Sequence, residues 1–399
     1  MTPPLPLAEA QRRLLAGVAP LAPEQRTVLD AHGRYLAAPV IARRTQPAAD
    51  LSAMDGYAMQ AGTPGPWRVI GETAAGHPFT GDVGAGEAIR ISTGALMPRG
   101  ADAVLMQENA RRTGDTLALN GEGEPSARHI RRAGFDFRIG DGVLAKGTRI
   151  GAAHVALALS AGQASLAVHR LPRLVAIDTG DELSPDPERC AEDQIPMSNG
   201  AMVAALARGY VEQVTMAGPV RDEVGALAAT FARFADCDVI VTSGGASVGD
   251  HDVLRPALEA WGATIDFWRV AMKPGKPLVI ARKGATLVLG LPGNPVSSYV
   301  TATMFLLPVL RKLAGATEYL PAPVTARTTR DLQAGSGGRL EFLRARIEGD
   351  RVTPLEERDS SALRSLAAAN ALIEWPADAP MAPAGTPVTV HRLENGGIA

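Results

Sequence analysis

The stretch that decides the fold is residues 173–182, RLVAIDTGDE, in which an apolar, strand-like run ends in a glycine and two carboxylates. From there the chain alternates between predicted strands and helices: strand 173–178, helix 199–208, strand 211–217, helix 223–234, strand 238–242 and helix 253–261. Predicted strands at 263–270, 278–281 and 287–290 and a helix at 296–313 follow. This alternation predicts an α/β fold with a doubly wound, mostly parallel sheet.

The regions on either side have a different pattern. Between residues 50 and 136, short β-type runs are separated by Gly, Pro or Asp about every ten residues, which is typical of a small β-rich domain. Apolar residues at helical spacing predict two short helices between Leu7 and Leu29. We therefore expect four parts: an N-terminal linking domain (1–49 plus 137–171), a β-rich inserted domain (50–136), the α/β domain (172–319) and a small C-terminal β-domain (320–399).

Composition narrows the class of protein. The 399 residues are more than one domain usually holds, and 40 Lys and Arg nearly balance 42 Asp and Glu, for a net charge of -2. That balance argues against a dedicated binder of nucleic acid or anionic membranes. The two cysteines make no disulfide framework or zinc pattern, and no signal peptide or long apolar run is present. We expect a cytoplasmic protein.

Ligands of open α/β sheets bind beyond the carboxyl ends of the strands, and the predicted loops there carry unusual chemistry. Asp181 and Glu182 follow the first strand, and a glycine-rich loop, SGGASVGDHD at 243–252, follows the third. Backbone N–H groups in such a loop can hold a phosphate or another oxyanion. Taken alone, the carboxylate pair is equally well explained as a solvated turn.

Two further loops are stiffened by proline. The segment KPGKP at 273–277 presents two lysines, and GLPGNPVS at 290–297 turns rigidly into a helix, although the second can be a purely structural turn. The four loops together offer lysines for anionic oxygens and carboxylates that would repel those same oxygens. A divalent cation resolves this conflict, and Mg²⁺ suits a phosphate or pyrophosphate substrate.

Seven motifs make the chain recognisable when they are taken in order. They are SAMDGYA (52–58), ISTGALMPRGADAV (91–104), RRAGFDF (131–137), DTGDEL (178–183), SGGASVGDHD (243–252), KPGKP (273–277) and LPGNPVSS (291–298). This set closely resembles the molybdopterin molybdenumtransferase family, to which the E domain of gephyrin is similar. The resemblance implies a homodimer whose α/β domain has a molybdopterin-binding fold. It also implies a Mg²⁺-dependent reaction of molybdate with adenylylated molybdopterin that yields molybdenum cofactor and AMP.

The resemblance also assigns roles to residues. It implies catalytic roles for Asp55, Thr93, Glu182, Asp222 and Lys273, and metal binding by Asp181, Glu182 and Asp252. Contacts to the bound pterin or nucleotide are implied for Asp136, Asp252, Lys276, Pro292, Pro295 and Ser365. The chemistry of the glycine-rich loop predicts the same for Ser243, Gly244, Gly245, Ser247 and Gly249, and we expect it of Arg269. The site it implies is composite and uses both subunits.

Three features depart from the family pattern. Arg269 stands where the family commonly has Lys, Met197 stands where it has Asp, and the residues before Ser365 do not follow the family's glycine-rich pattern. A paralogue specialised for tungstate stays open, and so do two other functions. A non-catalytic molybdopterin-binding scaffold would keep the fold without turnover, and a molybdopterin adenylyltransferase would need only the α/β domain. Partners implied by the resemblance are that adenylyltransferase and the proteins that mature molybdoenzymes.

Overall fold

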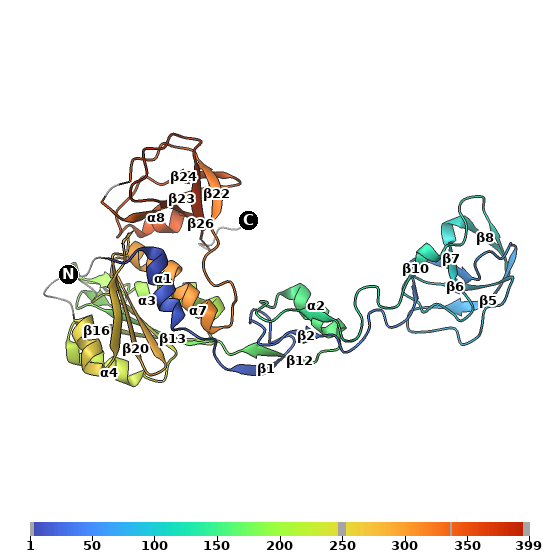
Figure 1. The fold of residues 1–399 in the computed structure, drawn as a ribbon, viewed down its shortest axis with the longest axis horizontal. Coiled ribbons are helices and arrows are strands. Elements are labelled where there is room, and N and C mark those ends of the chain that lie inside the picture. Colours follow the sequence, from blue (N-terminus) through green and yellow to red (C-terminus); the bar gives the residue numbers. More distant parts are fainter. Residues whose placement is uncertain (1–3, 246–252, 336, 394–399) are drawn as a thin grey trace.

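The computed structural model describes residues 4–245, 253–335 and 337–393. The molecule is elongated, with the α/β part and the C-terminal β part together at one end (Figure 1). The linking module lies in the middle, and the β-rich part lies at the far end. None of the helices within the described ranges is both long enough and apolar enough to cross a membrane.

The α/β part contains the predicted sheet. Its strand order is β16 (Gln213–Val220), β13 (Arg173–Thr179), β17 (Val239–Ser243), β21 (Thr286–Leu291), β20 (Pro277–Lys283) and β18 (Thr264–Arg269). The first four strands are parallel, β20 is antiparallel to β21, and β18 is antiparallel to β20. Strand β18 therefore runs in the same direction as the parallel four. The predicted mostly parallel sheet is confirmed.

Helices cover both faces of this sheet. One face packs against α1 (Leu7–Ala16), α3 (Asn199–Ala207), α6 (Pro295–Thr301) and α7 (Leu307–Leu313), and the other against α4 (Val224–Arg233) and α5 (Leu254–Trp261). Side chains along β13 point to alternate faces of the sheet: Leu174 packs in the apolar cluster on the first face, and Val175 and Ile177 pack in the cluster on the second. A short 3₁₀ helix at Arg208–Tyr210 follows α3, and β14 (Leu183–Ser184) pairs with β15 (Ile195–Pro196) beside the sheet.

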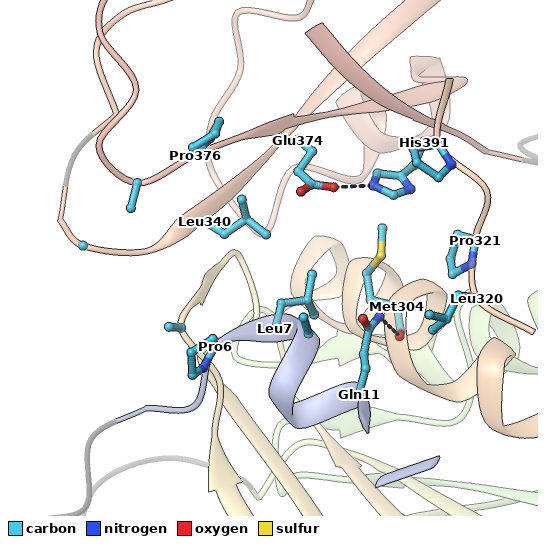
Figure 2. A pocket seen from close by; sticks show the side chains of 15 residues that line it. Pro6, Leu7, Gln11, Met304, Leu320, Pro321, Leu340, Glu374, Pro376 and His391 are labelled. Carbon is cyan, nitrogen blue, oxygen red and sulfur yellow. Dashed lines mark hydrogen bonds and ion pairs between the residues drawn. The ribbon is translucent and has the colours of Figure 1, made fainter. Parts of the chain in front are cut away.

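The helix predicted over 296–313 is interrupted by a π-helical turn at Ala302–Leu306. Pro308 has no N–H, so the Met304 carbonyl four residues earlier lacks its helical donor. The side chain of Gln11 supplies one, with Nε2 2.8 Å from that carbonyl oxygen. This bond lies in a pocket of about 530 Å³ between α1, the π turn and the C-terminal sheet, where Glu374 Oε2 lies 2.7 Å from His391 Nε2 (Figure 2).

The linking module corrects one prediction. Only the first of the two predicted N-terminal helices forms, because Pro23–Thr27 is strand β1, paired antiparallel with β12 (Ser165–His169). The partner strand supplies the backbone hydrogen bonds, and this outweighs the local helical spacing. The module also contains β2 (Val40–Ile41), paired with β11 (Gly142–Leu144), and helix α2 (Ala152–Ser160).

The two remaining parts are built on six-stranded sheets. The sheet of the β-rich part has the strand order β7 (Ala103–Met106), β4 (Gly56–Met59), β6 (Glu87–Ile91), β5 (Trp67–Thr73), β9 (Thr116–Leu119), β8 (Ala110–Thr113). Beside it, β3 (Leu51–Ser52) pairs with β10 (Ile130–Arg131), and 3₁₀ turns lie at Gln107–Asn109 and Ala127–His129. The C-terminal one has the order β19 (Met272–Lys273), β23 (Leu340–Glu348), β24 (Arg351–Pro354), β22 (Val324–Thr328), β26 (Pro387–Arg392), β25 (Ala371–Trp375), with helix α8 (Leu363–Ala368). Strand β19 lies in sequence between β18 and β20 of the α/β sheet but pairs with β23, so the two parts share backbone hydrogen bonds.

Candidate active site

The predicted loops meet at the carboxyl edge of the α/β sheet because the strands before them run in one direction. The Gly180 N–H donates to the Val220 carbonyl at 3.1 Å, which joins the loop after β13 to the end of β16. The Gly244 N–H lies 3.4 Å from the Leu291 carbonyl oxygen, which joins the loops after β17 and β21. Residues from Gly180 to Leu291, 111 positions apart in sequence, are thus placed on one surface, which we call the strand-end face.

Carboxylates gather at one side of the strand-end face. Asp181 and Glu182 are both exposed just beyond β13. The parallel pairing of β13 with β16 brings Asp222 beside them, and its backbone N–H lies 3.4 Å from Asp181 Oδ1. The structure therefore brings together three of the predicted acidic residues.

The glycine-rich loop begins in a conformation that requires glycine. Gly244 and Gly245 have φ values of +102° and +66°, and a Cβ at Gly244 would lie 2.4 Å from the Thr179 carbonyl oxygen. Ser243 is buried at the end of β17, and its hydroxyl faces Asp178, where it opposes the rise in pKa that burial causes. Ser247, Gly249 and Asp252 lie outside the described residues, so the phosphate-holding role of this loop stays a prediction.

The two lysines differ in their surroundings. Lys273 Nζ lies 3.0 Å from Glu341 Oε1 of β23, so its charge is matched by the C-terminal sheet. Lys276 is exposed and forms no ion pair within the described ranges. Arg269 ends β18, and its carbonyl accepts a hydrogen bond from the Leu5 N–H at 3.1 Å. Lys276 is thus the more available cation for an anionic ligand.

The C-terminal part contributes directly to the strand-end face. Pro292 is buried, and Pro295 is the first residue of α6. Asn294 Nδ2 donates to Ser360 Oγ at 2.7 Å, and the Ser360 carbonyl accepts from the Val296 N–H at 3.0 Å. Ser365, on α8, has a buried hydroxyl with no hydrogen-bond partner among the described residues. Buried hydroxyls without partners are uncommon, which favours a ligand or water at this position.

Sequence reasoning missed Arg344, a residue of β23 that is only 5% exposed. Its guanidinium donates to the carbonyls of Glu357, Asp359 and Ala362 at 2.6, 2.9 and 3.2 Å. Burial lowers the pKa of this guanidinium. Arg344 therefore holds the loop that carries Ser360 against the Leu291–Asn294 turn. The only sequence signal was an arginine within an apolar strand, which does not reveal what it binds.

Asp55 and Thr93 form a second group, on the β-rich part. Asp55 Oδ1 accepts the Thr93 N–H at 2.7 Å, although the two residues are 38 positions apart. That backbone hydrogen bond, together with the Thr93 side chain and the charge of Arg90, lowers the pKa of Asp55. Both side chains are exposed, so the pair is an ionised carboxylate that faces solvent.

Within one chain these two groups do not meet. The β-rich part lies at the opposite end of the molecule from the strand-end face (Figure 1). Asp136 lies between them, on the connection from β10 to β11, where its backbone N–H donates to the Gln46 carbonyl at 3.1 Å. A site that uses Asp55 together with Glu182 therefore needs more than one chain.

The exposed carboxylates fit a Mg²⁺ ion that is completed by water and substrate better than a metal ion held by protein side chains alone. Nowhere in the described parts of the chain do three or more His, Cys, Asp or Glu side chains gather in a way that could hold a metal ion. Mg²⁺ is commonly held by one or two carboxylates and completed by water and substrate phosphate. The exposed Asp181 and Glu182 fit an ion of that kind, one that binds with the substrate.

Comparisons with known proteins agree over nearly the whole chain. Residues 5–162 match the MoeA N-terminal region (domain I and II), residues 176–312 a probable molybdopterin binding domain, and residues 311–393 the MoeA C-terminal region (domain IV). The molybdopterin molybdenumtransferase of Haemophilus influenzae is 33% identical over 85% of this chain and 85% of that protein. Molybdopterin molybdenumtransferase 2 of Mycobacterium tuberculosis is 34% identical over 91% of this chain and 93% of that protein.

A solved structure extends the agreement to three dimensions. The molybdopterin biosynthesis moeA protein from Pyrococcus horikoshii OT3 has a TM-score of 0.84 and 28% identity, covering 98% of this chain and 100% of that one. The expected family and fold are confirmed together, and this chain belongs to the molybdopterin molybdenumtransferase family.

Proposed function

We propose that this chain inserts molybdenum into adenylylated molybdopterin, using molybdate and Mg²⁺, and releases AMP and molybdenum cofactor. The observation that carries the proposal is the strand-end face. Carboxylates and an available lysine of the α/β part and the unpartnered buried hydroxyl of Ser365 from the C-terminal part lie there on one surface. A phosphorylated pterin and an oxyanion need this combination of groups.

Each group has a role that follows from its chemistry. Lys276, Arg269 and the Gly245 amide attract the anionic oxygens of the substrates. Ser365 donates a hydrogen bond from a buried position. Asp181, Glu182 and Asp252 would hold Mg²⁺, with Asp222 beside them. Bound there, Mg²⁺ would neutralise phosphate charge that these carboxylates would otherwise repel.

We further propose that the working unit is a homodimer. Asp55 and Thr93 lie too far along the molecule to reach Glu182 of the same chain, so a second copy would supply them. Large apolar side chains are also left uncovered on the linking module and its connection to the β-rich part, including Leu29 (74% exposed) and Phe135 (75% exposed). A second chain would bury such residues.

Two other functions have less support. A molybdopterin adenylyltransferase would use the α/β part alone and leave the Asp55–Thr93 pair and the C-terminal contacts without a purpose. A scaffold without turnover would not need the exposed carboxylate group. The proposed reaction needs an enzyme that adenylylates molybdopterin upstream, and we place both in the cytoplasm.

The deciding experiment adds molybdate to the purified protein with adenylylated molybdopterin and Mg²⁺ and measures AMP. Molybdate-dependent AMP release supports the proposed transfer. AMP release without molybdate, or formation of the adenylylated pterin from ATP, would instead assign one of the other activities. Binding of the pterin with no turnover would favour the scaffold. Sedimentation at micromolar concentration tests the dimer, and a monomer would contradict it.

A further inference from the structure

A buried carboxylate that no proposed step uses lies directly beneath the strand-end face. Asp178 is the penultimate residue of β13 and is 3% exposed. It points to the α3 side of the sheet, and both of its carboxylate oxygens lie 2.9 Å from the Gly200 N–H. Burial raises the pKa of Asp178, and hydrogen bonds from the Gly200 N–H and the Ser243 hydroxyl oppose that rise.

This contact takes the place of a local helix cap. Ser198, the residue before α3, makes no side-chain capping bond, so a carboxylate from β13 binds a free N–H of the first turn instead. The approach requires glycine, because a Cβ at Gly200 would lie 2.6 Å from Asp178 Oδ2. Asp178 can therefore bind the N–H of residue 200 at this distance only if residue 200 is glycine.

The start of α3 in turn holds another loop of the site. Asn199, adjacent to Gly200, donates from Nδ2 to the Gly293 carbonyl at 2.6 Å. Gly293 belongs to the Leu291–Asn294 turn, which continues into Pro295 and binds Ser360 of the C-terminal part. A continuous set of contacts thus runs from Asp178 through Gly200 and Asn199 to this turn.

We propose that Asp178 is a positioning residue that anchors the start of α3 so that Asn199 holds the Leu291–Asn294 turn in place on the strand-end face. The kinetic consequence of this inference rests on the proposed function. The structural consequence does not, because it concerns only whether the turn is held.

The test compares Asp178→Ala, Asp178→Asn and Asn199→Ala by hydrogen–deuterium exchange and by kinetics of AMP release. Asp178→Ala should speed exchange in residues 290–296 and raise the KM for the adenylylated substrate roughly tenfold, with a smaller change in kcat. Asp178→Asn should restore most of both properties, since its amide oxygen can accept the Gly200 N–H. Asn199→Ala should reproduce the effect, and the double alanine variant should be no worse than Asp178→Ala alone.

Asp238→Asn is the matched control. Asp238 lies just before β17, at the opposite edge of the same sheet, and accepts two hydrogen bonds from Arg170 at 2.8 Å each. This variant should lose stability without changing exchange in 290–296 or KM. Unchanged exchange in folded Asp178→Ala, or an Asp178→Asn protein as impaired as the alanine variant, would overturn the inference.

The two proposals fail in different ways. If the wild-type protein releases no AMP, the proposed function is wrong, and the exchange data alone still decide whether Asp178 holds the turn. If Asp178→Ala does not fold, Asn199→Ala and Asp178→Asn decide: normal exchange in Asn199→Ala would overturn the inference, and faster exchange there with near-normal exchange in Asp178→Asn would support it.

Discussion

The two regions that carry the proposed catalytic residues are built differently. The strand-end face is assembled from four strand ends and a loop of the C-terminal part, and the buried side chains of Asp178 beneath it and of Arg344 behind that loop support it. The Asp55–Thr93 pair needs only two neighbouring turns of one sheet and faces solvent. The first region is a surface held in place by several elements, whereas the second is a single ionised group that faces solvent.

The linking module joins the α/β part at one end and the β-rich part at the other, and the first junction is held by more side-chain contacts than the second. Toward the α/β part, the guanidinium of Arg34 is buried and lies 2.9 Å from Glu24 and 2.6 Å from Glu212. The Tyr210 ring nearby lies 5.2 and 4.9 Å from the guanidinium carbons of Arg149 and Arg311. Toward the β-rich part, the two chain segments that enter and leave it are joined mainly by backbone hydrogen bonds, such as the one from the Asp136 N–H to the Gln46 carbonyl.

The principal ion pair at this second junction is between Arg132 and Asp50, at 2.6 Å and partly exposed. Exposed ion pairs contribute about 0–1 kcal/mol, so this one adds little rigidity. We therefore expect the linking module to move with the α/β part, and the β-rich part to be the one whose orientation adapts.

The largest effect should follow from removing charge at the strand-end face. Glu182→Gln keeps the side-chain shape, and we expect AMP release to fall roughly 100-fold at saturating Mg²⁺ while the melting temperature stays near wild type. Glu192→Gln, an exposed carboxylate between β14 and β15, is the control and should behave as wild type. Full activity of the Glu182 variant would remove that residue from the mechanism.

Mixed dimers test whether the two regions meet across chains. Asp55→Ala and Glu182→Ala should each be inactive alone. A heterodimer of the two would contain one site with both residues intact, so random mixing should restore about one quarter of wild-type activity. If mixing restores nothing although subunits exchange, the two residues do not share a site between chains.

The contrast between junctions predicts unequal stability losses. Arg34→Ala leaves Glu24 and Glu212 without their buried partner, and we expect the free energy of unfolding to fall by about 1–3 kcal/mol, after allowance for the partial exposure of both carboxylates. Arg132→Ala should cost less than about 1 kcal/mol. Urea denaturation of both variants measures the difference, and equal losses would contradict the contrast.

The smallest effect should come from Lys273. Its ion pair with Glu341 is partly exposed, so Lys273→Ala should cost less than about 1 kcal/mol of stability. The molybdate concentration needed for half-maximal AMP release should rise severalfold, because a cation is lost near the anion site. Lys276→Ala should raise it further, since no carboxylate neutralises Lys276 in the described structure. A larger effect of Lys273 would show that Glu341 releases it when substrate binds.

The sequence by itself determined the elements whose signal is local. Strand 173–178 was predicted and forms as Arg173–Thr179, and helix 253–261 forms as Leu254–Trp261. Apolar periodicity and the residues that end each run depend on a few neighbouring positions, so they can be read without knowing the fold. The order of the motifs identified the family for the same reason, because it requires no contact between them.

Tertiary structure decided everything that depends on a distant partner. Pro23–Thr27 is a strand because β12 lies beside it, and Arg344 is satisfied by carbonyls that only the folded loop brings near. Lys273 is paired because β19 joins the C-terminal sheet, and Asp178 caps a helix that begins 21 residues later. The separation of Asp55 from Glu182 likewise follows from how the parts are joined. Hydrogen bonds and ion pairs act over a few ångströms in space and take no account of distance along the chain, so only the folded chain establishes them.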